Sequence, residues 1–218
     1  MTPEKSSKRE GGALSWLAIY REPVVLRMFF LGFSSGLPLL LVLGTLSFWM
    51  REVGVDLKSI GFMSWVGLCW GMKWLWSPLV DKLRIPLLSS RLGQRRAWLL
   101  TAQIGLSVSL ALMAFADPAK SLTLTAALAL TTAFFGATQD IALDAFRIES
   151  GSEEKQAAFA ATYQTGYRLA MIWAGAGALA IAAFFETQFG TAVGWRSAYL
   201  VMSASMLVGV VTVLLSPE

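Results

Sequence analysis

Six long runs of mostly apolar residues leave this chain few alternatives to a helical membrane fold. A bilayer core about 30 Å thick is crossed by about 20 consecutive apolar residues when the segment is an α-helix. Backbone groups in lipid must also find hydrogen-bond partners inside the protein, and a helix supplies them within each segment. The runs therefore predict an all-α, polytopic membrane protein with six transmembrane helices. Their expected bounds are residues 24–50, 60–80, 97–116, 122–146, 157–185 and 195–215.

Composition agrees with this class and excludes several kinds of site. Only 15% of the residues are charged, whereas a soluble domain usually has about 25%. The chain has no histidine and a single cysteine, Cys69, so it cannot contain a disulfide framework, a Cys/His zinc site or a Ser-His-Asp triad of its own. Without histidine, and with its loop acids scattered, the chain is not expected to be an enzyme such as a membrane acyl or glycosyl transferase. We expect no metal and no cofactor.

The basic residues are unevenly distributed among the loops. Lysine and arginine gather before the first run and after the second and fourth runs, while the other loops hold few. Topology explains this excess better than a nucleic-acid partner does, because cytoplasmic loops of membrane proteins are rich in lysine and arginine. Both termini are therefore expected in the cytoplasm. Residues 1–23 are interpreted as a cytoplasmic N-terminal segment, and residues 24–218 as a transmembrane bundle.

Charged residues also occur inside the predicted spans, where each costs roughly 2.5–3.5 kcal/mol on insertion scales. Such groups usually face a bundle interior or a water-filled cavity and pair with one another. They predict a cavity in which a polar solute and a proton are bound; the alternative is a set of static ion pairs that fixes helix packing. Arg27 is set aside because it is close enough to a span end to snorkel. The candidate residues of the substrate and proton pathway are Asp140, Asp144, Lys73, Arg168, Gln139, Gln164 and Tyr167.

Small residues and a proline punctuate the first two spans. The sequence SSGLP at residues 34–38 is expected to break the first helix, since Pro38 removes a backbone donor. Gly32 and Gly36, and likewise Gly67 and Gly71, have the four-residue spacing that lets helices approach closely. Packing is the expected role of these glycines.

The loop that joins the second and third spans resembles the signature loop of the major facilitator superfamily. That loop combines an acidic residue with a glycine and a basic cluster, which lock neighbouring helices in one state. Ser77 stands where the family has its first glycine, and a longer insertion containing Pro86 separates the two halves of the pattern. A basic loop with one chance acid is the alternative. The matching residues, which we predict to form a conformational loop, are Asp81, Lys82, Gly93, Arg95 and Arg96.

Segments from five spans together resemble the AmpG-type muropeptide permeases of that superfamily. The segments are GFSSGLPLLLVLGTLSFWM, KSIGF, KWLWSPLVDK, GQRRAWLL, ATQDIALDAFR and GYRLAM. The resemblance implies a permease of the bacterial inner membrane that imports anhydromuropeptides, which are cell-wall recycling products, with the proton gradient. It also implies a link to β-lactamase induction in some Gram-negative bacteria. By position, it assigns the family's functional acids to Asp140 and Asp144, its lysine to Lys73 and its arginine to Arg168.

One departure from the family affects every functional expectation. The superfamily has twelve spans in two six-helix halves, with the substrate between them. Six predicted spans correspond to the N-terminal half, so the chain is expected to be a fragment or a half that needs a C-terminal half or second chain. A transporter of another anionic solute, similar to acetyl-CoA transporters, and a non-transporting half that acts as a partner or sensor remain alternatives.

Overall fold

The computed structural model describes residues 19–216, and helices make up most of this part of the chain, with no strand in it. Most of the predicted N-terminal segment, residues 1–18, therefore lies outside the described residues. Within the described part, five helical rods are long and apolar enough to cross a membrane. The expected all-α, polytopic class is confirmed, but one of the six expected spans is not a continuous helix. The five rods are Pro23–Glu52, Gln94–Met113, Leu122–Glu149, Lys155–Phe189 and Thr191–Leu215.

The first rod does not break where the sequence predicted. It consists of α1 (Pro23–Leu40), the π-helical turn η2 (Leu41–Thr45) and α2 (Leu46–Glu52). Ser34 and Pro38 are both buried within regular α1. Because Pro38 has no N–H to offer the Ser34 carbonyl, the hydrogen bonding is disturbed locally, and the irregularity appears just after it as the wider turn η2. The predicted helix break is therefore wrong: α1 continues through Pro38, and a π-helical turn follows it.

The second expected span is a succession of short helical pieces. Its start is capped by Asp56, which accepts hydrogen bonds from the Oγ (2.7 Å) and backbone N–H (2.9 Å) of Ser59. These two bonds lower the pKa of the Asp56 carboxyl. Glycine is a weak helix former, and the first of the two 3₁₀ turns ends at Gly67. A Cβ at Gly71 would meet nothing within 4 Å in the described part of the chain, so no described helix makes the expected close approach there. The pieces are α3 (Leu57–Met63), η3 (Ser64–Gly67), α4 (Leu68–Met72), η4 (Lys73–Leu75) and α5 (Ser77–Lys82).

A short linker leads from these pieces into the remaining rods. Leu87 has a φ of 64° before the single-turn helix α6, and Gly93 has a φ of 78° before α7. Only glycine adopts the second conformation without strain, which fixes Gly93 as the start of the third span. The elements that follow are α6 (Leu88–Leu92), α7 (Gln94–Met113), α8 (Leu122–Glu149), α9 (Glu153–Ile172), η5 (Trp173–Gly177), α10 (Ala178–Phe189), α11 (Thr191–Ser205) and α12 (Leu207–Leu215).

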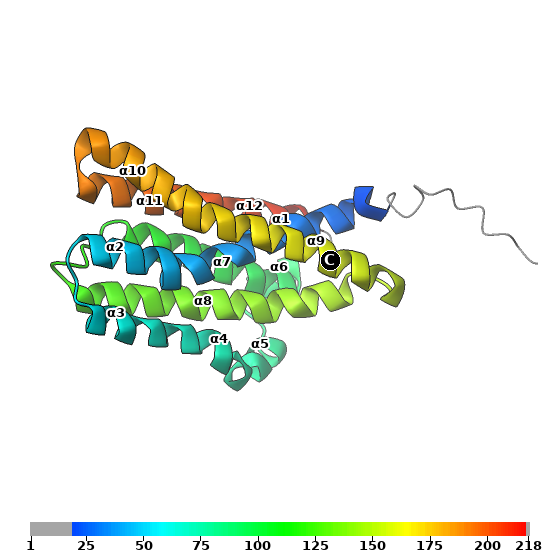
Figure 1. Cartoon of the computed structure of the whole chain (residues 1–218). Helices are drawn as coiled ribbons and strands as arrows, with labels where there is room; N and C mark the ends of the chain where they lie inside the picture. Colours follow the sequence, from blue (N-terminus) through cyan, green and yellow to red (C-terminus); the bar gives the residue numbers. More distant parts are fainter. Residues whose placement is uncertain (1–18, 217–218) are drawn as a thin grey trace, which may run out of the picture.

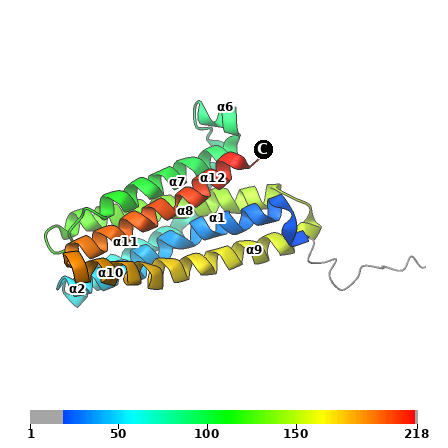
Figure 2. The same cartoon turned by 90° about the horizontal axis from the view of Figure 1, so that it is seen from above.

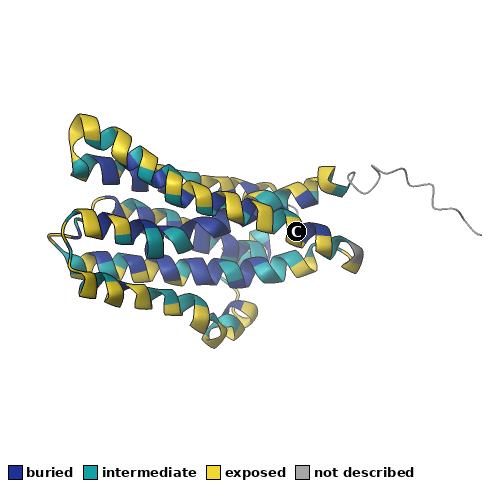
Figure 3. Cartoon of the chain, in the orientation of Figure 1, coloured by how far each residue is buried: buried dark blue, intermediate teal, exposed yellow. Residues whose placement is uncertain are grey.

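Successive segments of the bundle, with α3 to α5 counted as one segment, alternate in direction along the chain. In Figure 1, α9 and α10 run along the upper part of the bundle, α2 and α8 lie below them, and the pieces α3 to α5 form the lower edge. The view from above shows α12 and α1 between α7 and α9 (Figure 2). Burial colouring shows that α3 to α5 and the turn after α10 are largely exposed (Figure 3). The start of α1, the linker containing α6 and the α8–α9 connection share one end of the bundle.

Helices α1 and α9 pack with their backbones in close contact. A Cβ added at Gly32 or Gly36 would overlap the backbone of α9 at Tyr163 or Tyr167. In the same way, a Cβ added at Gly166 of α9 would overlap the backbone of α1. The expected packing role of Gly32 and Gly36 is confirmed, because any larger residue at these positions would push the two helices apart.

The opposite end of the bundle is closed by an aromatic cluster. The rings of Trp49 and Trp195 stack with centroids 5.8 Å apart, and the ring of Tyr199 lies 5.2 Å from that of Trp49. Polar tips of these side chains are also satisfied: Trp195 Nε1 donates to Glu52 (2.6 Å), and the Tyr199 hydroxyl donates to the Leu41 carbonyl in η2 (3.0 Å). This end therefore combines aromatic burial with paired donors, which fixes α2 against α11.

Candidate functional site

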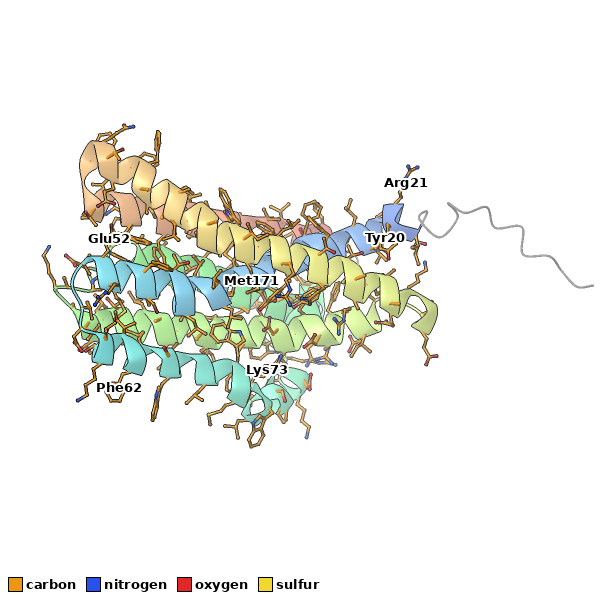
Figure 4. The ribbon with its side chains drawn as sticks, in the orientation of Figure 1. Tyr20, Arg21, Glu52, Phe62, Lys73 and Met171 are labelled. Carbon is orange, nitrogen blue, oxygen red and sulfur yellow. The ribbon has the colours of Figure 1, made fainter. Side chains whose placement is uncertain are left out.

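A charged cluster lies on one face of α8, where residues three and four apart become neighbours. Asp144 Oδ2 is 3.5 Å from the Lys73 ammonium, and Asp144 Oδ1 is 3.6 Å from the Arg147 guanidinium. The turn η4 brings Lys73 beside α8, as Figure 4 shows. The side chains of Lys73 and Asp144 are 35% and 48% exposed, so the cluster opens to the surface of the bundle. Lys73 and Asp144 were predicted as residues of one pathway because both are charged groups inside apolar spans, and the structure pairs them. Arg147, the second partner of Asp144, was not among the candidate residues.

Asp140, one turn earlier, has neutral partners. Ser35 of α1 donates a hydrogen bond to Asp140 Oδ1 over 2.5 Å, and the Ser35 oxygen lies 3.1 Å from the Tyr163 hydroxyl of α9. With Ser35 donating to the carboxylate, Tyr163 is placed to donate to Ser35. No lysine or arginine lies within 4.0 Å of Asp140 among residues 19–216. Three helices thus meet at this carboxyl group.

Helix α9 supplies an aromatic and polar face beside these carboxylates. The Arg147 guanidinium lies 5.5 Å from the ring centroid of Tyr163, a cation–π distance. The ring of Tyr167 is 6.0 Å from that of Tyr163. Gln164 and Arg168 are exposed, and in the described chain no carboxylate lies within 4.0 Å of Arg168. The structure therefore brings Tyr167 near the cluster, while Arg168 lies on the exposed surface of α9 without a carboxylate partner among the described residues.

Gln139, predicted in the same pathway, lies in a separate buried cluster. Its Nε2 and that of Gln103 both donate to the Ser34 hydroxyl, over 3.2 and 3.3 Å, and all three side chains are fully or almost fully buried. The side-chain carbonyl oxygens of Gln139 and Gln103 find no partner in the described protein. The structure therefore separates Gln139 from Asp140, although the two are adjacent in sequence.

Sequence reasoning missed two groups that the structure places at the centre of these sites. Ser35 was taken as part of a helix break, yet it holds Asp140; Ser34 likewise joins Gln103 and Gln139. The available signal was a pair of hydroxyl residues inside an apolar span. Such side chains seek partners on neighbouring helices when no water is present.

A second polar cluster joins the predicted conformational loop to the end of α8. Arg95 Nη1 lies 2.6 Å from Asp81, and its Nη2 lies 2.9 Å from Glu149. Gln94 donates to the Asp81 carbonyl over 2.5 Å. Arg95 therefore links α5, α7 and α8, and Glu149 is a partner that the sequence did not identify.

The other predicted residues of this loop have different surroundings. Arg96 Nε and Nη2 donate to the carbonyls of Val213 and Leu214, each over 3.1 Å, which caps the end of α12. Gly93 is buried and begins α7, whereas Lys82 is exposed and has no carboxylate within 4.0 Å in the described part of the chain.

We expect Arg95→Gln to lower the thermal stability of the purified protein. The change leaves Asp81 and Glu149 without their shared cation, at a cost of about 1–2 kcal/mol, because both pairs are partly exposed to solvent. The midpoint of thermal unfolding in detergent measures this effect. Lys120→Gln is the matched control, since Lys120 pairs with a single carboxylate and its side chain is 84% exposed. An equal midpoint for both variants contradicts the inferred link.

In residues 19–216 no group of three or more histidine, cysteine, aspartate or glutamate side chains is placed to hold a metal ion.

Comparison with known proteins identifies relatives over most of the chain. The family described as acetyl-coenzyme A transporter 1 matches residues 24–182. The chain is 41% identical over 203 residues to the anhydromuropeptide permease of Escherichia coli (strain K12), which is 93% of this chain and 39% of that relative. It is 38% identical over 164 residues to the putative transporter AmpG 4 of Rickettsia felis, covering 75% of this chain and 39% of the relative. The putative transporter AmpG 4 of Rickettsia conorii is 34% identical over 196 residues, covering 90% and 46%.

These relatives confirm the resemblance to AmpG-type permeases, and they are named as permeases and transporters rather than as enzymes. The chain spans less than half the length of the curated relatives it matches.

Proposed function

The chain belongs to the family described as acetyl-coenzyme A transporter 1, a family of major facilitator-type transporters that includes AmpG-type permeases among its relatives, and we propose that it forms the N-terminal half of a proton-coupled anhydromuropeptide importer. The observation that carries this proposal is the meeting of Ser35, Asp140 and Tyr163 beside the Lys73–Asp144–Arg147 cluster. Titratable groups of both signs inside a membrane bundle mark ion and substrate pathways.

Asp140 and Asp144 have different roles in this proposal. A proton that binds Asp144 weakens its attraction to both Lys73 and Arg147. A proton that binds Asp140 breaks no ion pair in the described chain, and the Ser35 hydroxyl can reorient to accept it. We therefore assign the transported proton to Asp140 and the fixed charge balance to Asp144.

The open face of α9 supplies contacts for the cargo. Arg168 is exposed and free of carboxylates within 4.0 Å among the described residues, so its guanidinium is available to a carboxylate of a peptide stem. Gln164, one turn earlier, adds hydrogen-bond donors and an acceptor. The ring of Tyr167 between them offers a stacking surface for a sugar.

Two more parts are needed for the bundle to act as a transporter. The first is a sixth span in addition to the five rods, which residues 57–82 form. A helical segment of this length, at about 1.5 Å per residue, is longer than the roughly 30 Å of a membrane core. Residues 57–82 run beside α8 in Figure 1. Second, a C-terminal half or second chain covers the open face, since transporters of this kind move a cavity between two halves. Arg95, with Asp81 and Glu149, would hold the helix ends in one of the two states.

The expected location is the bacterial inner membrane, with both termini in the cytoplasm. The bundle end that carries α6 and the α8–α9 connection holds Arg84, Arg91 and Arg95, and a basic end faces the cytoplasm. Lipid surrounds the outer faces of the bundle.

Membrane vesicles that contain the chain with its complementary half test the function and the topology together. Right-side-out vesicles are expected to accumulate labelled anhydromuropeptide when an inward proton gradient is imposed, and to stop when the gradient is collapsed. A protease site added at the N-terminus should be cut only in inside-out vesicles. Accumulation without a gradient would contradict the proposed proton coupling. Cleavage in right-side-out vesicles would show that the orientation is opposite to the one proposed.

Another anionic solute is the second candidate cargo, because the matching family carries the name acetyl-coenzyme A transporter 1. Excess unlabelled acetyl-CoA is expected to leave anhydromuropeptide uptake unchanged. Gradient-driven uptake of labelled acetyl-CoA, with no uptake of labelled anhydromuropeptide, would reassign the cargo. If a stable complex with another membrane protein forms and no solute is taken up, the chain is a partner or sensor instead.

A further inference from the structure

A cavity of about 450 Å³ at the α6 end of the bundle has no part in the proposed pathway. The start of α1, the start of α7 and the end of α8 enclose it. Three arginines line it, and the acid among its lining residues is Glu149. Its volume suits a small polar ligand or a lipid headgroup. Its position is distinct from that of Lys73, Asp140 and Asp144, which do not line it.

Two of the three arginines keep an unbalanced charge in this cavity. Arg95 is neutralised by Asp81 and Glu149. Arg96 uses Nε and Nη2 on the carbonyls of α12 and has no carboxylate within 4.0 Å among the described residues. Arg27, partly buried in α1, makes no ion pair or side-chain hydrogen bond within the same part of the chain. Its position near a span end does not by itself explain why Arg27 lines a cavity together with the guanidinium of Arg96.

The rim of the cavity adds favourable dipoles for an anion. Gly93 and Gln94, at the first turn of α7, line the cavity, and no side chain from residues 19–216 caps this 20-residue helix. Unsatisfied N–H groups and the positive end of a helix dipole favour negative charge. They act here together with the guanidinium groups, whose fork geometry fits phosphate oxygens.

We infer that this end cavity, enclosed by α1, α7 and α8, binds a phosphate-type oxyanion, held by Arg27 and by the free Nη1 of Arg96. Both a free phosphate compound and the headgroup of an acidic phospholipid present this chemistry, and basic pockets at the cytoplasmic side of membrane bundles bind such headgroups. Occupancy would bridge α1 to α7 and α8 at the end where Arg95 and Glu149 already join two of them. The inference does not depend on the identity of the transported cargo.

Binding to the purified, detergent-solubilised chain tests the inference with two probes. One probe is inorganic phosphate, followed by the shift in thermal unfolding with chloride as the reference anion. The other is phosphatidylglycerol in mixed micelles, followed by native mass spectrometry against phosphatidylcholine. A response to phosphate alone identifies a soluble ligand, and a response to phosphatidylglycerol identifies a lipid; either supports the site only if it depends on Arg27.

Arg27→Gln is expected to weaken the binding of the responding probe by about tenfold, the typical loss for a charge-assisted hydrogen bond. Arg51→Gln is the matched control, because Arg51 is an exposed arginine at the opposite end of the bundle. Ser150→Asp places a carboxylate at the cavity wall and should weaken binding without removing an arginine. Absence of binding to both probes, or equal binding by wild type and Arg27→Gln, overturns the inference.

Discussion

Asp140→Asn is expected to reduce proton-driven accumulation of anhydromuropeptide to the level of vesicles that lack the protein. The amide preserves size and still accepts a hydrogen bond from Ser35, so the contact between α1 and α8 survives. The amide cannot gain and lose a proton, however. The step of the transport cycle in which residue 140 binds or releases the proton therefore stops. Exchange of labelled for unlabelled cargo, which needs no net proton movement, should continue in the same vesicles.

Two controls separate this effect from a general loss of structure. Asp117→Asn alters a loop aspartate that pairs with Lys120, and it should leave accumulation unchanged. Asp144→Asn deprives Lys73 and Arg147 of their shared carboxylate and is expected to impair exchange as well as accumulation. Normal accumulation by Asp140→Asn would eliminate Asp140 as the proton carrier, whereas loss of both exchange and accumulation would point to a cargo-binding role.

The membrane class and five of the rods could be predicted because long apolar runs have one structural solution in lipid. The second predicted span shows the limit of that reasoning. Hydropathy reports average polarity, but the helix geometry at Gly67 and before Pro78 depends on local propensity and on packing beside α8. Thus the run was identified correctly as helical, and its 3₁₀ turns were not. The turn η4 nevertheless matters, since it presents Lys73 to α8.

The candidate site was predictable where a charge stood out against an apolar background. Lys73 and Asp144 are such a case, because burying one charge calls for its opposite nearby. The position of Gln139 was not predictable in this way. Adjacent residues on a helix point in directions about 100° apart, so Gln139 does not share the surroundings of Asp140. Asp140 meets Ser35, while Gln139 meets Ser34, and only the rotation of α1 against α8 decides which serine faces which residue.

Gly166→Val is the second change with a large expected effect, and it tests the packing on which the site depends. The new Cβ would overlap the carbonyl oxygen of Phe29 in α1, which is backbone and cannot move aside as a side chain would. Overpacking in a tight core typically costs 1–3 kcal/mol, so we expect a loss of about 3 kcal/mol or more here. Unfolding by sodium dodecyl sulfate titration in mixed micelles measures the loss.

The same change is expected to remove transport, because α9 carries Tyr163 to the Ser35–Asp140 pair and a displaced α9 breaks that contact. Gly61→Val is the matched control: Gly61 is also helical, but a Cβ there meets nothing within 4 Å. Its stability should stay close to that of the wild type. If Gly166→Val were as stable as Gly61→Val, α1 and α9 would have to pack further apart than the structure places them, and the meeting of three helices at Asp140 would lose its support.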